Sequence, residues 1–269
     1  MARRRLDAEL VRRKLVDSRR AAQEQIAAGL VVVDGAPADK PARLVDPGQD
    51  VRVLGPPPPF VSRAGGKLAH ALDEFGLDPS GWICVDVGSS TGGFTDCLLQ
   101  RGARLVTAID VGTHQLHEKL RGDDRVVVRE QTDVRSIDVA TVAGPVGLVV
   151  TDVSFISLSA VLPALAALAD GAPVIALVKP QFEVGKADAS KGRGVIRDPQ
   201  LWREVLTAVI GTAADLGLGL HGLSRSPVTG TKGNVEFVAH LRQGPSSLEP
   251  IEVIDAVAAG AHDAEREHP

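Results

Sequence analysis

Aromatic residues are scarce in this chain of 269 residues, which has no tyrosine, two tryptophans and six phenylalanines. Proteins that hold single-stranded nucleic acid by stacking line a groove with aromatic rings. An aromatic content of 3% excludes stacking as the main way in which this protein could hold a nucleic acid. Recognition of shape and backbone phosphates is the alternative that this composition permits.

Cysteine is equally rare, with only Cys84 and Cys97 in the whole chain. Their spacing is not that of a metal site, and both fall in apolar segments. We therefore expect two buried, reduced and inert thiols, and no metal.

The sequence also lacks an uninterrupted apolar run of membrane-spanning length. Its longest apolar tract, residues 160–178, is broken by Pro163, Asp170, Gly171 and Pro173, a pattern that indicates a helix, a turn and a strand. The arginine-rich N-terminus has no apolar core of a signal peptide. We expect a cytoplasmic protein, and no insertion segment of a pore-forming one.

Charge is distributed unevenly. Residues 1–67 carry 13 Lys/Arg and 8 Asp/Glu, whereas the rest of the chain carries 17 and 26, within a total of −4. A basic cluster on a small domain is typical of a surface that binds phosphate backbones. A helix face whose charged side chains are simply solvated is the alternative explanation of the cluster. The cluster comprises Arg3, Arg4, Arg5, Arg12, Arg13, Lys14, Arg19 and Arg20.

The pattern of elements predicts two domains. Residues 1–55 read as a small α+β domain, with two short helices within 5–30 and strands at 30–33 and 51–54. Four consecutive prolines then begin a stiff linker over 56–62. A larger domain follows at 63–244, and 245–269 reads as a short helix with a frayed tail.

Helices and strands alternate in the larger domain, which predicts a largely parallel sheet covered by helices on both faces. The predicted strands are 82–86, 104–109, 125–129, 147–152, 173–178, 219–224 and 234–239. The predicted helices are 65–76, 92–101, 113–120, 157–169 and 199–216. The last two strands read as a hairpin and hence as an antiparallel edge.

A glycine-rich segment, residues 86–96, follows the first predicted strand and opens a helix. Such a turn lets a ligand approach bare backbone N–H groups, and an acid some 20 residues later, here Asp110, is placed to bind ribose hydroxyls. The spacing differs from G-x-G-x-x-G and is typical of a loop that holds S-adenosylmethionine. An ordinary tight turn, with glycines that only relieve crowding, is the alternative.

Charged residues also end other apolar strands. Asp152 follows residues 148–151 and Lys179 follows 174–178, while Glu236 lies within a third apolar run. Ligands bind at the carboxyl ends of strands in open α/β sheets, so these groups are candidates for chemistry. For Lys179 the alternative is a side chain that merely reaches out to solvent.

These motifs together resemble the TlyA family of rRNA 2′-O-ribose methyltransferases, also called hemolysins, with an FtsJ-like catalytic domain. The resemblance lies in 86–94, 152–157, 177–183 and 229–236. The N-terminal segment resembles the RNA-binding domain of ribosomal protein S4, through 5–7, 18–19, 34–35 and 40–41 together with Ile26 and Gly29. The implied fold is a Rossmann-like S-adenosylmethionine-dependent methyltransferase domain behind a small α+β RNA-binding domain.

The resemblance implies a catalytic tetrad at Lys67, Asp152, Lys179 and Glu236. The enzyme must position a ribose hydroxyl and help to remove its proton. Lys179 would act as a neutral base or as a cation that stabilises the alkoxide. Asp152 would orient Lys179 and the cofactor, and the other two would fix the hydroxyl.

Cofactor contacts are expected at the strand ends and in the glycine-rich loop, with Asp110 on the ribose and Asp133 facing the adenine. Phe155 would close over the ligand or pack in the core. The full set is Asp86, Gly88, Ser89, Ser90, Gly92, Phe94, Asp110, Asp133, Asp152 and Phe155.

The implied partner is ribosomal RNA within 30S or 50S subunits, with cytidines of 16S helix 44 and 23S helix 69 as the targets of longer family members. A flipped nucleotide would enter the pocket of a monomeric enzyme. Expected phosphate contacts are Arg5, Arg19, Lys40, Arg63 and Arg135. Residues 58–61 depart from the family's Arg-Ala-Trp-Val, which leaves coupling through the linker open.

Three other functions stay as alternatives at this point. A hemolysin would need an insertion segment, and a dehydrogenase would need G-x-G-x-x-G with a hydride-site acid or histidine. A pseudouridine synthase, or a non-catalytic ribosome-assembly factor, could carry the same N-terminal domain.

Overall fold

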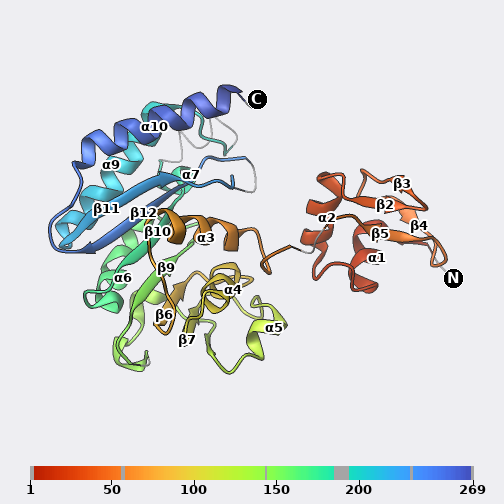
Figure 1. The fold of residues 1–269 in the computed structure, drawn as a ribbon, viewed down its shortest axis with the longest axis horizontal. Coiled ribbons are helices and arrows are strands. Elements are labelled where there is room, and N and C mark those ends of the chain that lie inside the picture. The colour runs from red at the N-terminus through yellow and green to blue at the C-terminus, as the bar shows by residue number, and fades with distance from the viewer. Residues whose placement is uncertain (1–2, 56–57, 143, 185–193, 231–232, 268–269) are drawn as a thin grey trace. The chain divides into compact units, whose positions relative to one another are not determined.

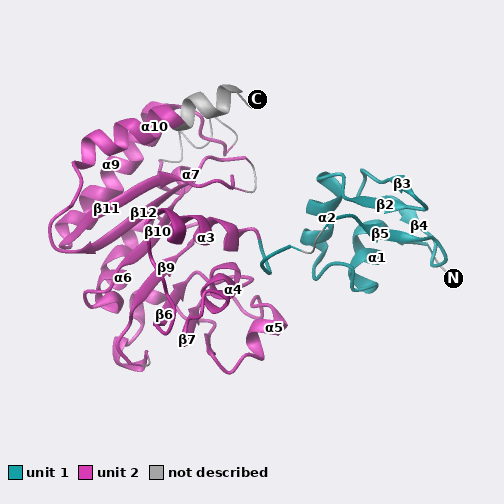
Figure 2. Cartoon of the chain, viewed as in Figure 1, with its two compact units in different colours: residues 1–62 teal, residues 63–269 magenta. Residues whose placement is uncertain are grey.

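The computed structural model describes residues 3–55, 58–142, 144–184, 194–230 and 233–267. The chain forms two compact units, residues 1–62 and 63–269, which are coloured separately in Figure 2. Three predicted features lie partly outside the described residues: the linker at Pro56 and Pro57, the motif at Thr231 and Lys232, and the end of the tail.

The first unit is a small α+β domain (Figure 1). Its core is built by Leu6, Leu10 and Ile26 from the helices against strand valines such as Val31 and Val45. Two short sheets form, in the orders β1-β4 and β3-β2-β5. The elements are β1 (Arg4–Arg5), α1 (Leu6–Arg12), α2 (Arg19–Ala27), β2 (Val31–Val33), β3 (Ala36–Pro37), β4 (Leu44–Val45) and β5 (Val51–Val53).

The second unit contains a seven-stranded sheet in the order β11-β12-β10-β9-β6-β7-β8. All neighbours pair in parallel except β12, which runs antiparallel to both β10 and β11. The mostly parallel α/β fold is thereby confirmed. The strands are β6 (Ile83–Val87), β7 (Leu105–Ile109), β8 (Val126–Arg129), β9 (Leu148–Thr151), β10 (Val174–Val178), β11 (Leu218–Arg225) and β12 (Phe237–Gln243).

Helices cover both faces of this sheet, as side-chain alternation along the strands requires. Val85 and Val87 point into a core with Trp202 and Ile254 from the helices of one face. On the other face, Asp86 meets Thr95 of α4. The helices are α3 (Ala64–Glu74), α4 (Gly93–Gln100), α5 (Glu118–Arg121), α6 (Leu162–Ala169), α7 (Pro180–Glu183), α9 (Pro199–Asp215) and α10 (Pro250–Glu267).

Two predicted helices are wrong in extent. The helix predicted over 113–120 is confined to Glu118–Arg121, because His114 has a positive φ of 53° and Glu130 binds the N–H groups ahead of the helix. The short C-terminal helix with a frayed tail is instead an 18-residue helix, α10. Buried Ile254 and Ala258 on its apolar face pack against the main core.

Both cysteines are free and buried, as predicted. Burial raises the pKa of each thiol to about 12. Thiolate chemistry is therefore suppressed at both positions.

Asp86 is a fully buried acid in the central strand β6. One carboxylate oxygen accepts a hydrogen bond of 2.6 Å from the Thr95 hydroxyl, while the other has no partner among the described residues. Burial is the main cause that raises the pKa of this carboxyl to about 7. A charged Asp86 is consequently a cost to the fold at neutral pH.

This cost can be measured through Asp86→Asn. Because the folded-state pKa lies above the unfolded value, Asp86 favours the folded state below about pH 4, and that contribution is lost as pH rises through about 7. The stability of Asp86→Asn relative to the natural chain should rise across this window by on the order of 4 kcal/mol. Urea unfolding of both proteins from pH 4 to 8 tests this, and a difference independent of pH would contradict it.

Candidate active site at the carboxyl edge of the sheet

Two lysine–carboxylate pairs lie at the carboxyl edge of the parallel strands. Lys67, on α3, donates a hydrogen bond of 2.5 Å to Glu236, and both side chains are buried. Lys179, directly after β10, forms an ion pair with Asp152, directly after β9. The four residues predicted as a tetrad are thus held as two pairs.

The direction of β12 explains how the pairs come together. Val178 is aligned with Phe237 across the antiparallel β10–β12 ladder, so Lys179 and Glu236 occupy the next, neighbouring positions. Glu236 precedes its strand, whereas the sequence placed it inside one. Running antiparallel brings the start of β12 to the edge where the parallel strands end.

Neighbouring side chains, missed in the sequence analysis, fix both pairs. The Ser154 hydroxyl accepts a hydrogen bond of 2.7 Å from Lys179. The Gln181 amide donates to the second oxygen of Glu236 at 3.3 Å. A Cβ at Gly230 would lie 2.4 Å from Glu236, so only glycine leaves room for this carboxylate. Both residues lie inside the motifs at 152–157 and 177–183, and each is within two residues of a tetrad member, but the sequence analysis assigned a role to neither.

The glycine-rich loop lies against the same edge. Gly88 has a φ of 81°, and a Cβ there would come within 3.1 Å of the Asp152 backbone oxygen. Gly92 has a φ of 97°, and a Cβ there would lie 2.3 Å from Leu120. Glycine is thus required at both positions, for backbone conformation and for close approach. Ser89 and Phe94 are buried.

Asp110 ties this loop to the next one. Its two carboxylate oxygens accept hydrogen bonds from the backbone N–H of Ser90, at 2.8 Å, and of Gly112, at 2.7 Å. Each oxygen keeps a second lone pair for a ligand hydroxyl. Asp110 lies directly after β7, and its contact to a ribose stays a prediction.

Glu130 is a further organising residue that the sequence analysis missed. It accepts hydrogen bonds from the backbone N–H of His114 and Gln115 and pairs with Arg121 at 2.6 Å. These interactions, the His114 N–H first, lower the pKa of Glu130 to about 2. The carboxylate therefore holds the loop that carries Gln115 towards Ser90.

Asp133 and Arg135, predicted for separate roles, bind each other. Their side chains form an ion pair of 2.6 Å, and Asp133 also accepts the Arg135 backbone N–H. The guanidinium is the main cause that lowers the pKa of Asp133 to about 2. An adenine contact from Asp133 and a phosphate contact from Arg135 would each compete with this pair.

Phe155 does not pack in the core, so that alternative is wrong. Its side chain is 92% exposed, with a positive φ of 65°, and its ring lies 5.1 Å from that of Phe182. Because the preceding Ser154 binds Lys179, this exposed ring stands beside the second pair.

In the first unit, Arg5 and Arg19 both form ion pairs with Asp7, at 2.9 and 3.0 Å. Lys40 is exposed in the same unit. Arg63 is exposed at the start of α3 in the second unit.

Among the described residues, no three His, Cys, Asp or Glu side chains gather into a set that could hold a metal ion. The same residues form no helix that is both long and apolar enough to span a membrane.

Two family models match this chain. Residues 60–243 match the FtsJ-like methyltransferase model, and residues 4–51 match the S4 domain model. The first model covers the whole sheet and both lysine–carboxylate pairs. The second covers both helices of the first unit.

Named relatives match over nearly the full length. The 16S/23S rRNA (cytidine-2′-O)-methyltransferase TlyA of Mycobacterium tuberculosis is 49% identical over 90% of this chain and 91% of its own. Hemolysin A of Brachyspira hyodysenteriae is 40% identical over 88% and 98%. A solved structure from Streptococcus thermophilus that carries the name hemolysin is 42% identical, with a TM-score of 0.79 over 99% and 98%. The chain belongs to the TlyA family, in which an S4 domain precedes an FtsJ-like methyltransferase domain.

Proposed function

We propose that this protein transfers a methyl group from S-adenosylmethionine to the 2′-hydroxyl of cytidine in ribosomal RNA. The observation that carries the proposal is the presence of two lysine–carboxylate pairs beside the glycine-rich loop, in a chain 49% identical to a named rRNA (cytidine-2′-O)-methyltransferase. The dehydrogenase, assembly-factor and membrane-active alternatives lack such support.

The loop residues fit an adenosyl ligand. A Cβ at Gly88 would crowd the backbone of Asp152, and Asp110 offers fixed carboxylate oxygens at the neighbouring strand end. Gly88, Ser89, Ser90, Gly92 and Asp110 would hold the cofactor. Asp86 and Phe94 would support the loop from inside, and Asp133 and Phe155 would border it. When bound, S-adenosylmethionine supplies an activated methyl group on a sulfonium.

The two lysine–carboxylate pairs would position the ribose 2′-hydroxyl and stabilise the charge that develops on its oxygen. Lys179 pairs with Asp152 and donates to Ser154, an arrangement that suits its ammonium form. That geometry favours Lys179 as a cation that stabilises the developing alkoxide while the hydroxyl proton leaves to solvent water, rather than as a neutral base that accepts this proton. Lys67 and Glu236 would position the same ribose. The β10–β12 register puts Glu236 beside Lys179, so both pairs can reach one hydroxyl.

The S4 domain would supply affinity for RNA. Arg5, Arg19 and Lys40 would contact phosphates, with Arg63 and Arg135 doing so from the catalytic domain. Cytidines in 16S helix 44 and 23S helix 69 are the proposed targets, reached by flipping the nucleotide out of its stack. A ribosomal substrate implies action in the cytoplasm, and we propose a monomeric enzyme.

Mapping of ribose methylation tests the proposal directly. Purified 30S and 50S subunits lacking these modifications are incubated with the protein and S-adenosylmethionine, and the rRNA is analysed by mass spectrometry. New 2′-O-methylcytidine is expected. Its absence on both subunits, or a methyl group on a base, would contradict the proposed reaction.

Lys179→Ala separates chemistry from cofactor binding. We expect methyl transfer to fall by about 10²–10⁴-fold, while the affinity for S-adenosylmethionine changes little, because Lys179 acts on the hydroxyl. Single-turnover rates and calorimetry measure the two effects. Lys119→Ala is the matched control, since Lys119 pairs with Asp96 at 3.4 Å but is largely exposed. Full activity in Lys179→Ala would remove Lys179 from the mechanism.

Deletion of residues 1–62 tests the division of labour. The second unit has its own core, so the shortened protein should fold and bind S-adenosylmethionine. It should no longer methylate intact subunits, because the basic domain that holds the RNA is gone. Methylation at the full-length rate would show that the S4 domain is dispensable.

A further inference from the structure

Helix α1 of the S4 domain carries two buried carboxylates. Asp7 is fully buried and Glu9 is 1% exposed, in a unit of only 62 residues. Burial of a charge is costly unless the group is paired and hydrogen-bonded. Both acids therefore need strong partners.

Asp7 is surrounded by donors. Arg5 binds it through two nitrogens, at 3.1 and 2.9 Å, and Arg19 binds it at 3.0 Å. Gln23 and the Ala8 backbone N–H complete the set. These bonds, that of Arg5 above all, hold the pKa of Asp7 far below its usual range.

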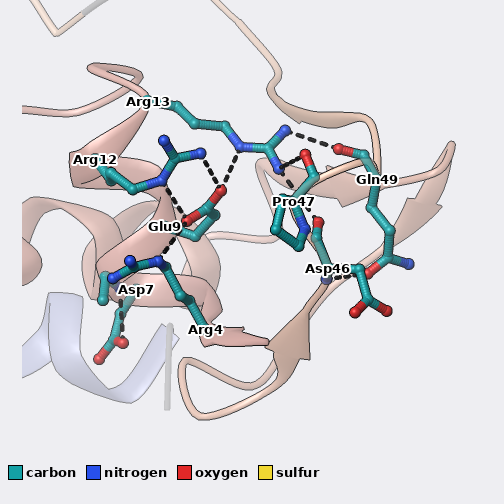
Figure 3. Close-up of polar contacts among 9 residues, drawn as sticks. Arg4, Asp7, Glu9, Arg12, Arg13, Asp46, Pro47 and Gln49 are labelled. Atoms are coloured by element: carbon teal, nitrogen blue, oxygen red, sulfur yellow. Dashed lines mark hydrogen bonds and ion pairs between the residues drawn. The ribbon is translucent and has the colours of Figure 1, made fainter. Parts of the chain in front are cut away.

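Glu9 organises a second arginine cluster, shown in Figure 3. Arg12 binds it through two nitrogens, at 2.8 and 2.6 Å, and Arg13 binds it at 2.8 Å. Arg4 approaches to 4.0 Å. The pKa of Glu9 is lowered to about 2, mainly by Arg12.

Arg13 differs from its neighbours in this cluster. It is anchored to the backbone oxygens of Pro47 and Gln49, and only 20% of its side chain is exposed. Arg4 and Arg12 are 60% and 50% exposed. Arg13 thus serves the fold, while Arg4 and Arg12 are presented to solvent.

In both clusters the acid is buried, and the arginines other than Arg13 are about half exposed. Arg5 and Arg12 are each held through Nε and one terminal nitrogen, so the remaining N–H groups of the planar fork face away from the acid. A fork fixed in this way is pre-organised for a phosphate.

We propose that Asp7 and Glu9 are positioning residues that hold two arginine pairs, Arg5 with Arg19 and Arg4 with Arg12, to bind two sets of backbone phosphates in RNA. The inference rests on the proposed RNA substrate and deepens it. Arg4 and Arg12 become RNA contacts that the motif analysis did not select, and two acids become promoters of binding to a polyanion.

The proposal predicts that the loss of the Asp7 charge weakens RNA binding, whereas the change in net charge alone would strengthen it. Removing a negative charge from an RNA-binding surface should strengthen binding if only the overall field matters. Releasing two fixed arginines should weaken it, because each must be ordered again at the phosphate. The sign of the change therefore separates the two explanations.

Asp7→Asn in the full-length protein is the test variant, with Asp50→Asn as the matched control. Asp50 pairs with Arg52 in the same domain, but both side chains are at least half exposed. Binding to purified 30S and 50S subunits is measured over a salt series, with thermal unfolding as a check on folding. We expect Asp7→Asn to bind about tenfold more weakly, and Asp50→Asn to bind equally well or better.

The salt dependence gives a second readout. In Asp7→Asn, each phosphate contact that a released Arg5 or Arg19 no longer makes should reduce the slope of log K against log salt by about 0.7–0.9. Binding by folded Asp7→Asn that equals or exceeds that of Asp50→Asn would overturn the proposal. Failure of the natural protein to bind either subunit would instead overturn the proposed RNA substrate, and this inference with it.

A variant cycle distinguishes positioning from simple structural support. In an Arg5→Gln/Arg19→Gln background, adding Asp7→Asn should cause no further loss of RNA affinity, because nothing is left to position. A further loss would show that Asp7 only supports the fold.

The exposed double variant Arg4→Gln/Arg12→Gln tests the second pair without burying a new group. It should bind subunits more weakly and lower the salt slope by about two contacts. An unchanged slope would exclude Arg4 and Arg12 as phosphate contacts, even if Asp7→Asn failed to fold.

Discussion

The reversed direction of one strand determines the candidate active site. If β12 ran parallel to β10, its start would lie at the opposite edge of the sheet, and Glu236 would lie far from Lys179. Because it runs antiparallel, with Val178 opposite Phe237, the residue before the strand joins the residue after β10. Lys67 on α3 can then pair with Glu236, so both lysine–carboxylate pairs lie at the carboxyl edge of the parallel strands.

Buried charge is compensated in the same way in both units. Glu236 is buried and held by Lys67 and Gln181, and Asp7 is buried and held by Arg5 and Arg19, whose guanidinium groups are themselves partly exposed. A buried pair contributes little net stability, but it fixes geometry. Asp86 is the contrast, since it has one hydroxyl partner and a raised pKa.

Much of the fold was readable from the sequence, because alternating apolar runs and turn residues report local structure directly. Strands β6 to β10 lie within a residue or two of their predicted ranges. The prediction of a helix over 113–120 was wrong in extent because of an interaction that is distant in the sequence. Its N–H groups are taken by Glu130, which follows β8, and no local pattern reveals that competition.

The candidate site shows the same division between local and non-local information. Sequence motifs selected Lys67, Asp152, Lys179 and Glu236, but which lysine pairs with which carboxylate could be known only from the order of the strands in the sheet. The bond between Asp133 and Arg135 was hidden because each residue was assigned to a different ligand.

The arginines of the S4 domain show why composition alone misleads. A net charge counts Asp7 and Glu9 against phosphate binding, and the chain as a whole is acidic. In the structure these two acids lie beneath the arginines and take up bonds that would otherwise be made with water. What a polyanion meets depends on which member of each ion pair is exposed. The sign of the charge that the surface presents is therefore set by which side chains are buried, and a charge count along the sequence does not give it.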